Sequence, residues 1–231
     1  DYADYLCAYG EVAKKAIQSK HDSELYKIIK KMSDMKEDPY VSDDELKKIE
    51  VKLEKKSSES HWISEANELA RMNWWTIEYG LIGELNNPKI YGAGLLSSVS
   101  ESLECLNKKV EKIPISIDCI HQDYNITEPQ PQLYVANNFK DLIKILDNYS
   151  KTMGFKTGGK DGIKKAIQSE NVTTALYDSG LQISGIIKNY ISNDYGEITY
   201  LSYDKNVQLS YNNNEIPNHG IDYHSKGYGA A

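Results

Sequence analysis

Cysteine is scarce in this sequence, which has three in 231 residues, and no two of them show the C-x-x-C spacing of a zinc knuckle or a redox motif. Cys7, Cys105 and Cys119 are also odd in number and far apart along the chain. This pattern argues against a disulfide framework. We expect the three thiols to be reduced and buried.

Long apolar runs and clusters of positive charge are missing as well. No run approaches the roughly 18–20 apolar residues that span a bilayer, and residues 1–20 lack the regions of a signal peptide. The 27 basic residues include a single arginine, Arg71, and they alternate with acidic residues to give a net charge of −7. Such a balance offers no footprint for nucleic acid. We expect a cytoplasmic protein with neither a membrane nor a nucleic-acid partner, and its oligomeric state is left open.

Helical periodicity dominates the first two thirds of the chain. Hydrophobic residues make up 40% of the sequence, which is enough for a substantial core. Spacings of three and four residues predict helices over about 1–20, 21–35, 60–82 and 139–153, and a further helix that starts at Ser42. Asp22 is the expected cap of the second helix, and Ser42 with Glu45 forms a capping box. Strands are few here, with a short one predicted within "NNPKIYGAGLLSS" and another at 133–136.

The pattern changes from about residue 155. "GFKTGGKDG" reads as a glycine-rich hinge, and "VTTALY", "LQISGIIKNY", "EITYLSY" and "NVQLSY" then alternate polar and apolar residues as strands do. The sequence therefore predicts an α+β protein. We expect a mainly α domain over 1–153, a hinge and short helix over 154–167, and a small antiparallel β domain over 168–231.

One carboxylate, Glu78, lies between apolar and aromatic runs in "NWWTIEYGLIGELNNPKIYGAGLLSS" at 73–98. The helical period places it on the stripe of the 60–82 helix that faces the core. An ionised carboxylate there is costly unless it is paired or bound to a metal. Three interpretations are open: an ion pair with Arg71, a general acid or base, and a metal ligand.

Three blocks of the sequence carry a family resemblance. "WWTIEYGLI", "IYGAGLLSS" and "YNITEPQPQLYVANNF" resemble, in this order, the pterin-dependent aromatic amino acid hydroxylases, strongly over about 60–153. "TALYDSGLQISG" and "IPNHGIDYH" resemble an extension found in a bacterial branch of that family. The resemblance implies a catalytic domain of hydroxylase type that converts an aromatic amino acid, phenylalanine to tyrosine, with tetrahydropterin, dioxygen and non-haem Fe(II).

The resemblance also implies roles for single residues. Glu78 matches the carboxylate of a site in which two histidines and one carboxylate hold Fe(II). The same match places Trp74 and Tyr79 in the aromatic walls of the substrate pocket. It places Ser97 and Ser98 near the polar end of the substrate, and Tyr124 and Ile126 in a loop at the pocket edge.

The match departs from the family at the iron ligands. The H-E-x-x-[GA]-H segment that supplies the two histidines is absent, and "HGIDYH" repeats only its spacing, with glycine in place of the glutamate. We expect that the sequence begins just after the missing segment, so that this chain by itself binds iron poorly and is inactive. Two alternatives stay open. One is a non-catalytic ligand-binding or scaffolding protein derived from a hydroxylase, and the other is an iron site rebuilt from His219, His224 and Glu78.

Overall fold

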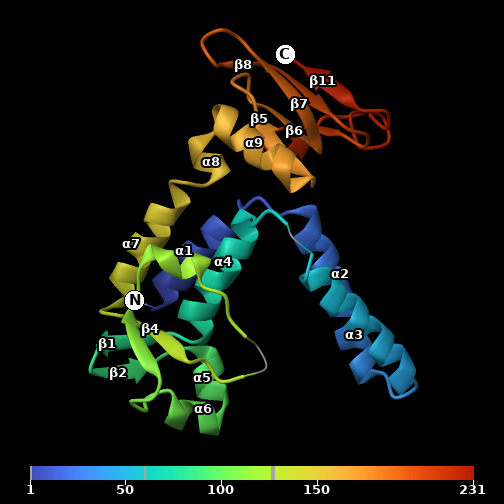
Figure 1. Ribbon diagram of the computed structural model, residues 1–231. Coiled ribbons are helices and arrows are strands. Elements are labelled where there is room, and N and C mark those ends of the chain that lie inside the picture. The colour runs from blue at the N-terminus through green and yellow to red at the C-terminus, as the bar shows by residue number, and fades with distance from the viewer. Residues whose placement is uncertain (1, 60, 126–127) are drawn as a thin grey trace. The chain divides into compact units, whose positions relative to one another are not determined.

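The computed structural model describes residues 2–59, 61–125 and 128–231 (Figure 1). The chain divides into two compact units. Unit 1 comprises Asp1–Ala16 and Glu65–Thr157, and unit 2 comprises Ile17–Ser64 and Gly158–Ala231. Both contain helices and short strands, which confirms the predicted α+β class. The domain boundaries expected at 153 and 168 stay a prediction. Among the helices of the described residues, none combines the length and the apolar character that a bilayer crossing requires.

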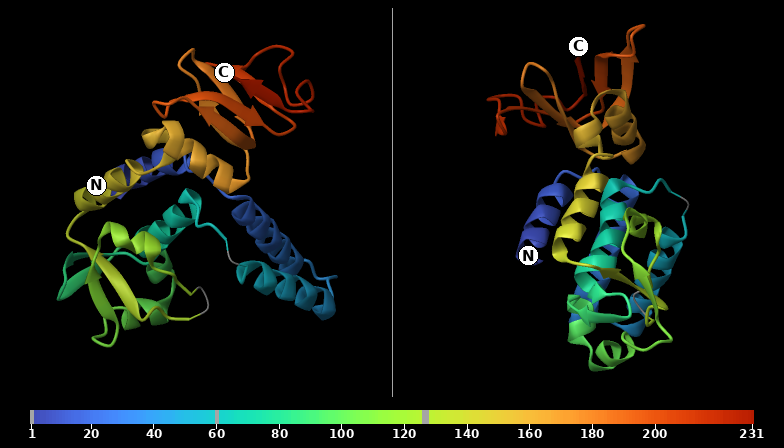
Figure 2. Two further views of the ribbon diagram at one scale, coloured as in Figure 1. Left: turned by 45° about the horizontal axis from the view of Figure 1, so that its top comes forward. Right: turned by 90° about the vertical axis from the view of Figure 1, so that its left-hand side faces the viewer.

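Helices form most of unit 1. Figure 2 shows α1, α4 and α7 side by side, and hydrogen bonds from Tyr9 to Leu69 and from Tyr149 to Glu65 join α4 to the other two. The helical elements of unit 1 are α1 (Tyr2–Ala13), α4 (Glu65–Asn73), the π-helix η1 (Trp74–Glu78), α5 (Ala93–Ser97), α6 (Val99–Glu104), the 3₁₀-helix η2 (Ile117–His121), α7 (Phe139–Ser150) and α8 (Gly154–Thr157).

A four-stranded sheet completes unit 1, with the strand order β2-β1-β4-β3. Its strands are β1 (Leu81–Glu84), β2 (Asn87–Ile90), β3 (Glu111–Pro114) and β4 (Gln132–Ala136). β1 runs antiparallel to β2 and parallel to β4, and β3 also runs parallel to β4. β4 is a central strand, and 133–136 are accordingly buried.

The helix predicted over 60–82 is wrong in its length. α4 begins at Glu65, and at Trp74 the backbone changes to a π-helix that ends at Glu78. The N–H of Tyr79 donates to the carbonyl of Trp74, five residues back, at 2.8 Å. A π-turn holds more residues than an α-turn, so it shifts the side chains that follow out of the α-helical stripe. Glu78 is therefore half-buried, not directed into the core as the α-helical period predicts.

The core of unit 1 packs helix side chains against the sheet. Its largest fully buried side chains include Trp75, Tyr5, Tyr149, Leu69, Met72 and Leu81. Cys105 and Cys119 are buried there as expected, whereas Cys7 is exposed. Cys7 lies on the solvent side of α1, so the expectation that all three thiols are buried is wrong for Cys7.

A helical hairpin forms the first part of unit 2 and consists of α2 (Lys20–Glu37) and α3 (Asp43–Ser57). The predicted capping box of α3 is confirmed, because the N–H and the hydroxyl of Ser42 both donate to Glu45. The N-cap of α2 is Ser19, not Asp22. Asp22 is the third helical residue of a second capping box: its N–H donates to Ser19 Oγ, and its carboxylate accepts the Ser19 N–H.

The second part of unit 2 is rich in strands, all paired antiparallel. The strand orders are β10-β9-β6-β5 in one sheet and β11-β8-β7 in the other. Buried side chains such as Ile183, Ile187 and Val207 form its core, against which α9 packs. The elements are α9 (Gly159–Ser169), β5 (Thr173–Leu176), β6 (Leu181–Gly185), β7 (Ile187–Ser192), β8 (Ile198–Tyr203), β9 (Gln208–Tyr211), β10 (Asn214–Glu215) and β11 (Tyr228–Ala230).

Candidate functional site

Two glycines hold the end of the π-helix close to the chain that follows β2. A Cβ atom on Gly92 would lie 2.4 Å from the carbonyl oxygen of Glu78, and one on Gly94 would lie 3.4 Å from the carboxylate oxygen Oε2 of Glu78. The sequence "YGAG" therefore permits an approach that a larger residue at Gly92 would prevent. This contact fixes the place of Glu78 relative to α5.

The Glu78 carboxylate forms no ion pair and no hydrogen bond with the residues that the structure describes. Its charge is nevertheless sensed by two tyrosines. Burial, and then the charge of Glu78, raise the pKa of Tyr2. Burial, followed by Glu101 and then Glu78, raises the pKa of Tyr79. A half-buried carboxylate without a partner among the described residues remains available for a cation or a metal ion.

The ion-pair interpretation of Glu78 is wrong. Nη2 of Arg71 lies 2.6 Å from Oδ1 of Asp123, and Nη1 donates to the carbonyl of Ile120 at 3.2 Å. A separation of seven residues brings side chains together on an α-helix, but the π-turn between Arg71 and Glu78 changes that phase. The guanidinium therefore has partners of its own.

Trp74 lies between two tyrosine rings. Its ring centroid is 4.5 Å from that of Tyr79 and 4.3 Å from that of Tyr124, with interplanar angles of 21° and 10°. The hydroxyl of Tyr79 donates to Glu101 at 3.2 Å. Nε1 of Trp74 is buried and finds no hydrogen-bond partner among the described residues. The two tyrosines cover the faces of the indole, so another ring can meet Trp74 only at its edge.

A groove with a volume of about 350 Å³ borders this stack. It is lined by Tyr9, Ala13, Ala16, Ala66, Leu69, Ala70, Asn73, Trp74 and Tyr124. Tyr79 instead lines a cavity of about 30 Å³ together with Glu101 and Cys105. Glu78 is not among the residues that line either space. The structure thus brings the three aromatic residues into one stack, but Trp74 and Tyr79 border different hollows.

The serine pair occupies two helix termini. Ser97 is exposed at the end of α5, and its hydroxyl donates to the carbonyl of Gly94 at 2.8 Å. Ser98 is the N-cap of α6 and accepts the N–H of Glu101 at 3.4 Å. Both hydroxyls have local partners, and a role near a substrate stays a prediction. Ile126 lies outside the described residues.

Two residues near the site were missed by sequence reasoning. Glu101 accepts the hydroxyl of Tyr79, and Tyr2 senses the charge of Glu78. The S-x-x-E spacing of Ser98 and Glu101 indicates a helix start. No local pattern links Glu101 to Tyr79, which is 22 residues away along the chain.

The donor set of unit 1 fits an iron site only in part. Two imidazoles are needed beside Glu78, but His121 is the single histidine in the sequence of unit 1. His219 and His224 belong to unit 2, where Nδ1 of His219 lies at hydrogen-bond distance, 2.9 Å, from Nε2 of His224. Unit 1 therefore contains a carboxylate of the required kind at Glu78 and a single imidazole in its sequence.

A comparison with family profiles decides the classification. The profile described as "Biopterin-dependent aromatic amino acid hydroxylase" matches residues 23–158, which is more than half of the chain. The chain belongs to this family. The match includes Glu78, the aromatic stack and the glycines that contact Glu78, and it confirms the resemblance found in the sequence.

Individual members of the biopterin-dependent hydroxylase family are similar over shorter segments. Bovine phenylalanine-4-hydroxylase is 41% identical over 86 residues, which are 37% of this chain and 19% of the relative. Tyrosine 3-monooxygenase of Drosophila melanogaster is 40% identical over 90 residues, which are 38% of this chain and 16% of the relative. Phenylalanine-4-hydroxylase of Chromobacterium violaceum is 40% identical over 76 residues, which are 32% of this chain and 26% of the relative. The matched segment is thus about a quarter or less of each relative.

Among solved structures, the chain is similar to the iron- and phenylalanine-bound phenylalanine hydroxylase of Chromobacterium violaceum. The identity is 32%, the TM-score is 0.34, and the match covers 36% of this chain and 34% of that one.

Proposed function

We propose that the protein to which this chain belongs hydroxylates an aromatic amino acid, converting phenylalanine to tyrosine with non-haem Fe(II), tetrahydropterin and dioxygen. Membership of the hydroxylase family supports the reaction class. The names of the relatives from cattle and Chromobacterium violaceum support phenylalanine as the substrate.

The observation that carries the proposal is the state of Glu78. Within residues 2–59, 61–125 and 128–231, its half-buried carboxylate has no ion-pair or hydrogen-bond partner. A π-helix supplies it, and π-helices are frequent at functional sites. A carboxylate is one of the three protein ligands of non-haem iron oxygenases. We assign Glu78 to that role.

The aromatic stack supports a ring-shaped substrate. Trp74 and Tyr124 form one wall of a groove of about 350 Å³. This volume is in the range of about 300–1,000 Å³ found for small-molecule pockets, and aromatic walls favour aromatic ligands. We assign Trp74 and Tyr79 to substrate binding, Ser97 and Ser98 to the region of its polar end, and Tyr124 and Ile126 to the pocket edge.

Product analysis tests the reaction class. The protein encoded by the complete reading frame that contains these residues is supplied with Fe(II), tetrahydropterin, dioxygen and, in separate reactions, phenylalanine, tyrosine or tryptophan. We expect tyrosine from phenylalanine, formed only when tetrahydropterin is present. Iron-loaded protein that hydroxylates none of the three amino acids would contradict the proposal.

A binding function without catalysis is the second candidate. It is favoured by the single histidine of unit 1, because a groove can retain an aromatic ligand when the iron ligands are missing. Calorimetric titration of the 231-residue chain with phenylalanine addresses it. Two results together would favour the binding function over the enzyme. The chain would bind phenylalanine and lose this binding in Trp74→Ala, and the protein from the complete reading frame would form no tyrosine.

A further inference from the structure

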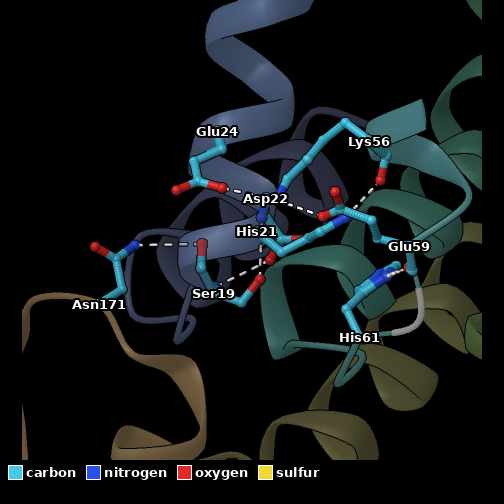
Figure 3. A network of polar contacts seen from close by, with 8 residues as sticks. All are labelled: Ser19, His21, Asp22, Glu24, Lys56, Glu59, His61 and Asn171. Carbon is cyan, nitrogen blue, oxygen red and sulfur yellow. Dashed lines mark hydrogen bonds and ion pairs between the residues drawn. The ribbon is translucent and has the colours of Figure 1, made fainter. Parts of the chain in front are cut away.

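We propose that His21, Asp22 and His61 form a binding site for a divalent transition-metal ion such as Zn²⁺ at the base of the α2–α3 hairpin. All three belong to unit 2, and Figure 3 shows them close together. One potential ligand atom from each of the three lies within 4.8 Å of the others. The site shares no residue with the site at Glu78, so this inference does not rest on the proposed function.

Backbone carbonyls select the tautomer of both histidines. Nε2 of His21 lies 2.9 Å from the carbonyl oxygen of Lys56, and Nδ1 of His61 lies 2.9 Å from the carbonyl oxygen of Glu59. A carbonyl can only accept, so each of these nitrogens carries the proton. The lone pair therefore lies on Nδ1 of His21 and on Nε2 of His61. Histidine ligands of metals are oriented in this way, with the second ring nitrogen donating to a carbonyl or carboxylate.

The free nitrogen of His21 is an unusual feature of the fold. Its Nδ1 atom is buried and has no hydrogen-bond partner within the described part of the chain. Leaving a buried polar atom unsatisfied costs about 1–3 kcal/mol. A metal ion at this position would remove that cost, because it takes up the lone pair.

Asp22 presents one carboxylate oxygen in a fixed orientation. Its Oδ2 atom accepts the N–H of Ser19 at 2.9 Å and the hydroxyl of Ser64 at 2.5 Å. Oδ1 accepts no hydrogen bond from the described residues. The capping box of α2 thus also positions a carboxylate whose second oxygen can bind a metal.

The two imidazole rings are stacked, with centroids 3.7 Å apart and an interplanar angle of 10°. Lone pairs lie in the ring planes, so metal binding requires one of the rings to tilt. His61 is exposed and follows the end of the hairpin, so its ring is the one with room to tilt. Two imidazoles and one carboxylate, completed by water, are a ligand set that Zn²⁺ accepts in tetrahedral geometry.

The charge that favours a cation is that of Asp22. Lys56 forms ion pairs with Glu24 and Glu59, each at 2.7 Å (Figure 3). Lys20 also acts on Glu24, and Lys55 acts on Glu59, so ammonium groups offset these two carboxylates. Asp22 has no ion pair among the described residues, and a divalent ion would pair with its charge. It would also join the start of α2 to the segment after α3, and so link the two ends of the hairpin.

Cobalt titration tests the site. The 231-residue chain is freed of metal with a chelator and titrated with Co²⁺, whose visible absorption bands report tetrahedral coordination, and Zn²⁺ is then added in competition. We expect a single tight equivalent that Zn²⁺ displaces. His61→Ala should weaken binding by at least about 100-fold, since loss of a partner that only orients a ligand already costs about 10–100-fold.

Matched variants distinguish this site from other histidines. His121→Ala removes an exposed histidine of unit 1 and should leave affinity unchanged. Asp22→Asn, which keeps an oxygen for the cap of α2, should weaken binding. Zn²⁺ should raise the thermal midpoint of the parent protein and of His121→Ala, but not of His61→Ala. Binding that survives His61→Ala, binding that is lost instead in His219→Ala, or no binding at all would each overturn the proposal.

Discussion

Arg71 and Asp123 form an ion pair in which Nη2 of the arginine lies 2.6 Å from Oδ1 of the aspartate. The arginine side chain is only 14% exposed, and it also donates to the carbonyl of Ile120. Its charge is therefore satisfied without Glu78. A substitution at Glu78 therefore leaves the ion pair of Arg71, on the preceding helix α4, in place.

Removal of the Glu78 side chain should leave the fold intact. We expect Glu78→Ala to change the free energy of unfolding by less than about 1 kcal/mol, because within the described residues no partner is lost. Removing one partner of a buried ion pair would cost about 3–5 kcal/mol instead. Urea unfolding measures the difference, with the exposed Glu84→Ala as the control. A loss of 3 kcal/mol or more, on the order expected for a broken buried pair, would contradict this assignment.

Gly92 should not tolerate even one added methyl group. A Cβ atom there would lie 2.4 Å from the carbonyl oxygen of Glu78 and 2.6 Å from the backbone nitrogen of Gly80, and neither backbone atom can rotate away. We expect Gly92→Ala to destabilise the protein by about 1–3 kcal/mol or more, as overpacking does.

Gly10→Ala is the matched control for Gly92→Ala. It lies inside α1, where a Cβ atom would meet nothing within 4 Å. It should stabilise the protein by up to about 1 kcal/mol, the difference in helix propensity between glycine and alanine. Equal thermal midpoints for the two variants would mean that the close approach at Glu78 is not present in solution.

The sequence predicted local features of the fold better than distant contacts. The capping box at Ser42 and Glu45 involves neighbours on one helix, and it is confirmed. For α2, the residue types of Ser19 and Asp22 are both suited to an N-cap. Which of them caps the helix depends on where the backbone becomes helical, and the residue types do not determine this. The sequence predicts Asp22 as the cap, yet its carboxylate accepts hydrogen bonds from Ser19 and Ser64.

The region of Glu78 shows why the rest was not predictable. Periodicity cannot separate a π-turn from an α-turn, so the predicted helix continues through Leu81, which in the structure pairs with β2 and β4. Those partners lie far along the chain. The family resemblance points to Trp74, Tyr79 and Tyr124, and the structure stacks them. No sequence pattern, however, indicates that Arg71 pairs with Asp123.

The ring stack should contribute measurable coupling energy. We expect a double-mutant cycle of Trp74→Ala and Tyr124→Ala to give about 0.5–1.5 kcal/mol, the value typical of aromatic pairs. Tyr124→Phe should keep the coupling, because it preserves the ring that packs at 4.3 Å. Combining Trp74→Ala with Tyr195→Ala, at a residue that is 91% exposed, should be additive. Chemical unfolding of each variant supplies the energies, and zero coupling between Trp74 and Tyr124 would argue against the stack.

The three cysteines should differ in reactivity. Burial raises the pKa of the Cys119 thiol to about 12, so at pH 8 almost none of it is the reactive thiolate. Burial also raises the pKa of Cys105, whereas Cys7 is exposed. Brief maleimide labelling followed by peptide mass spectrometry should therefore modify Cys7 first, and denaturant should release the other two. Rapid labelling of Cys119 in the folded protein would contradict the described core.

The most direct test of a catalytic role for Glu78 is tyrosine formation by Glu78→Gln in the protein from the complete reading frame. The substitution keeps the shape of the side chain and removes its charge, and Glu84→Gln is the matched control. If Glu78 is the carboxylate ligand of iron, Glu78→Gln should lose bound iron and tyrosine formation together, while its thermal midpoint stays near that of the parent. A folded Glu78→Gln protein that binds iron and forms tyrosine at the parent rate would show that Glu78 is not the ligand.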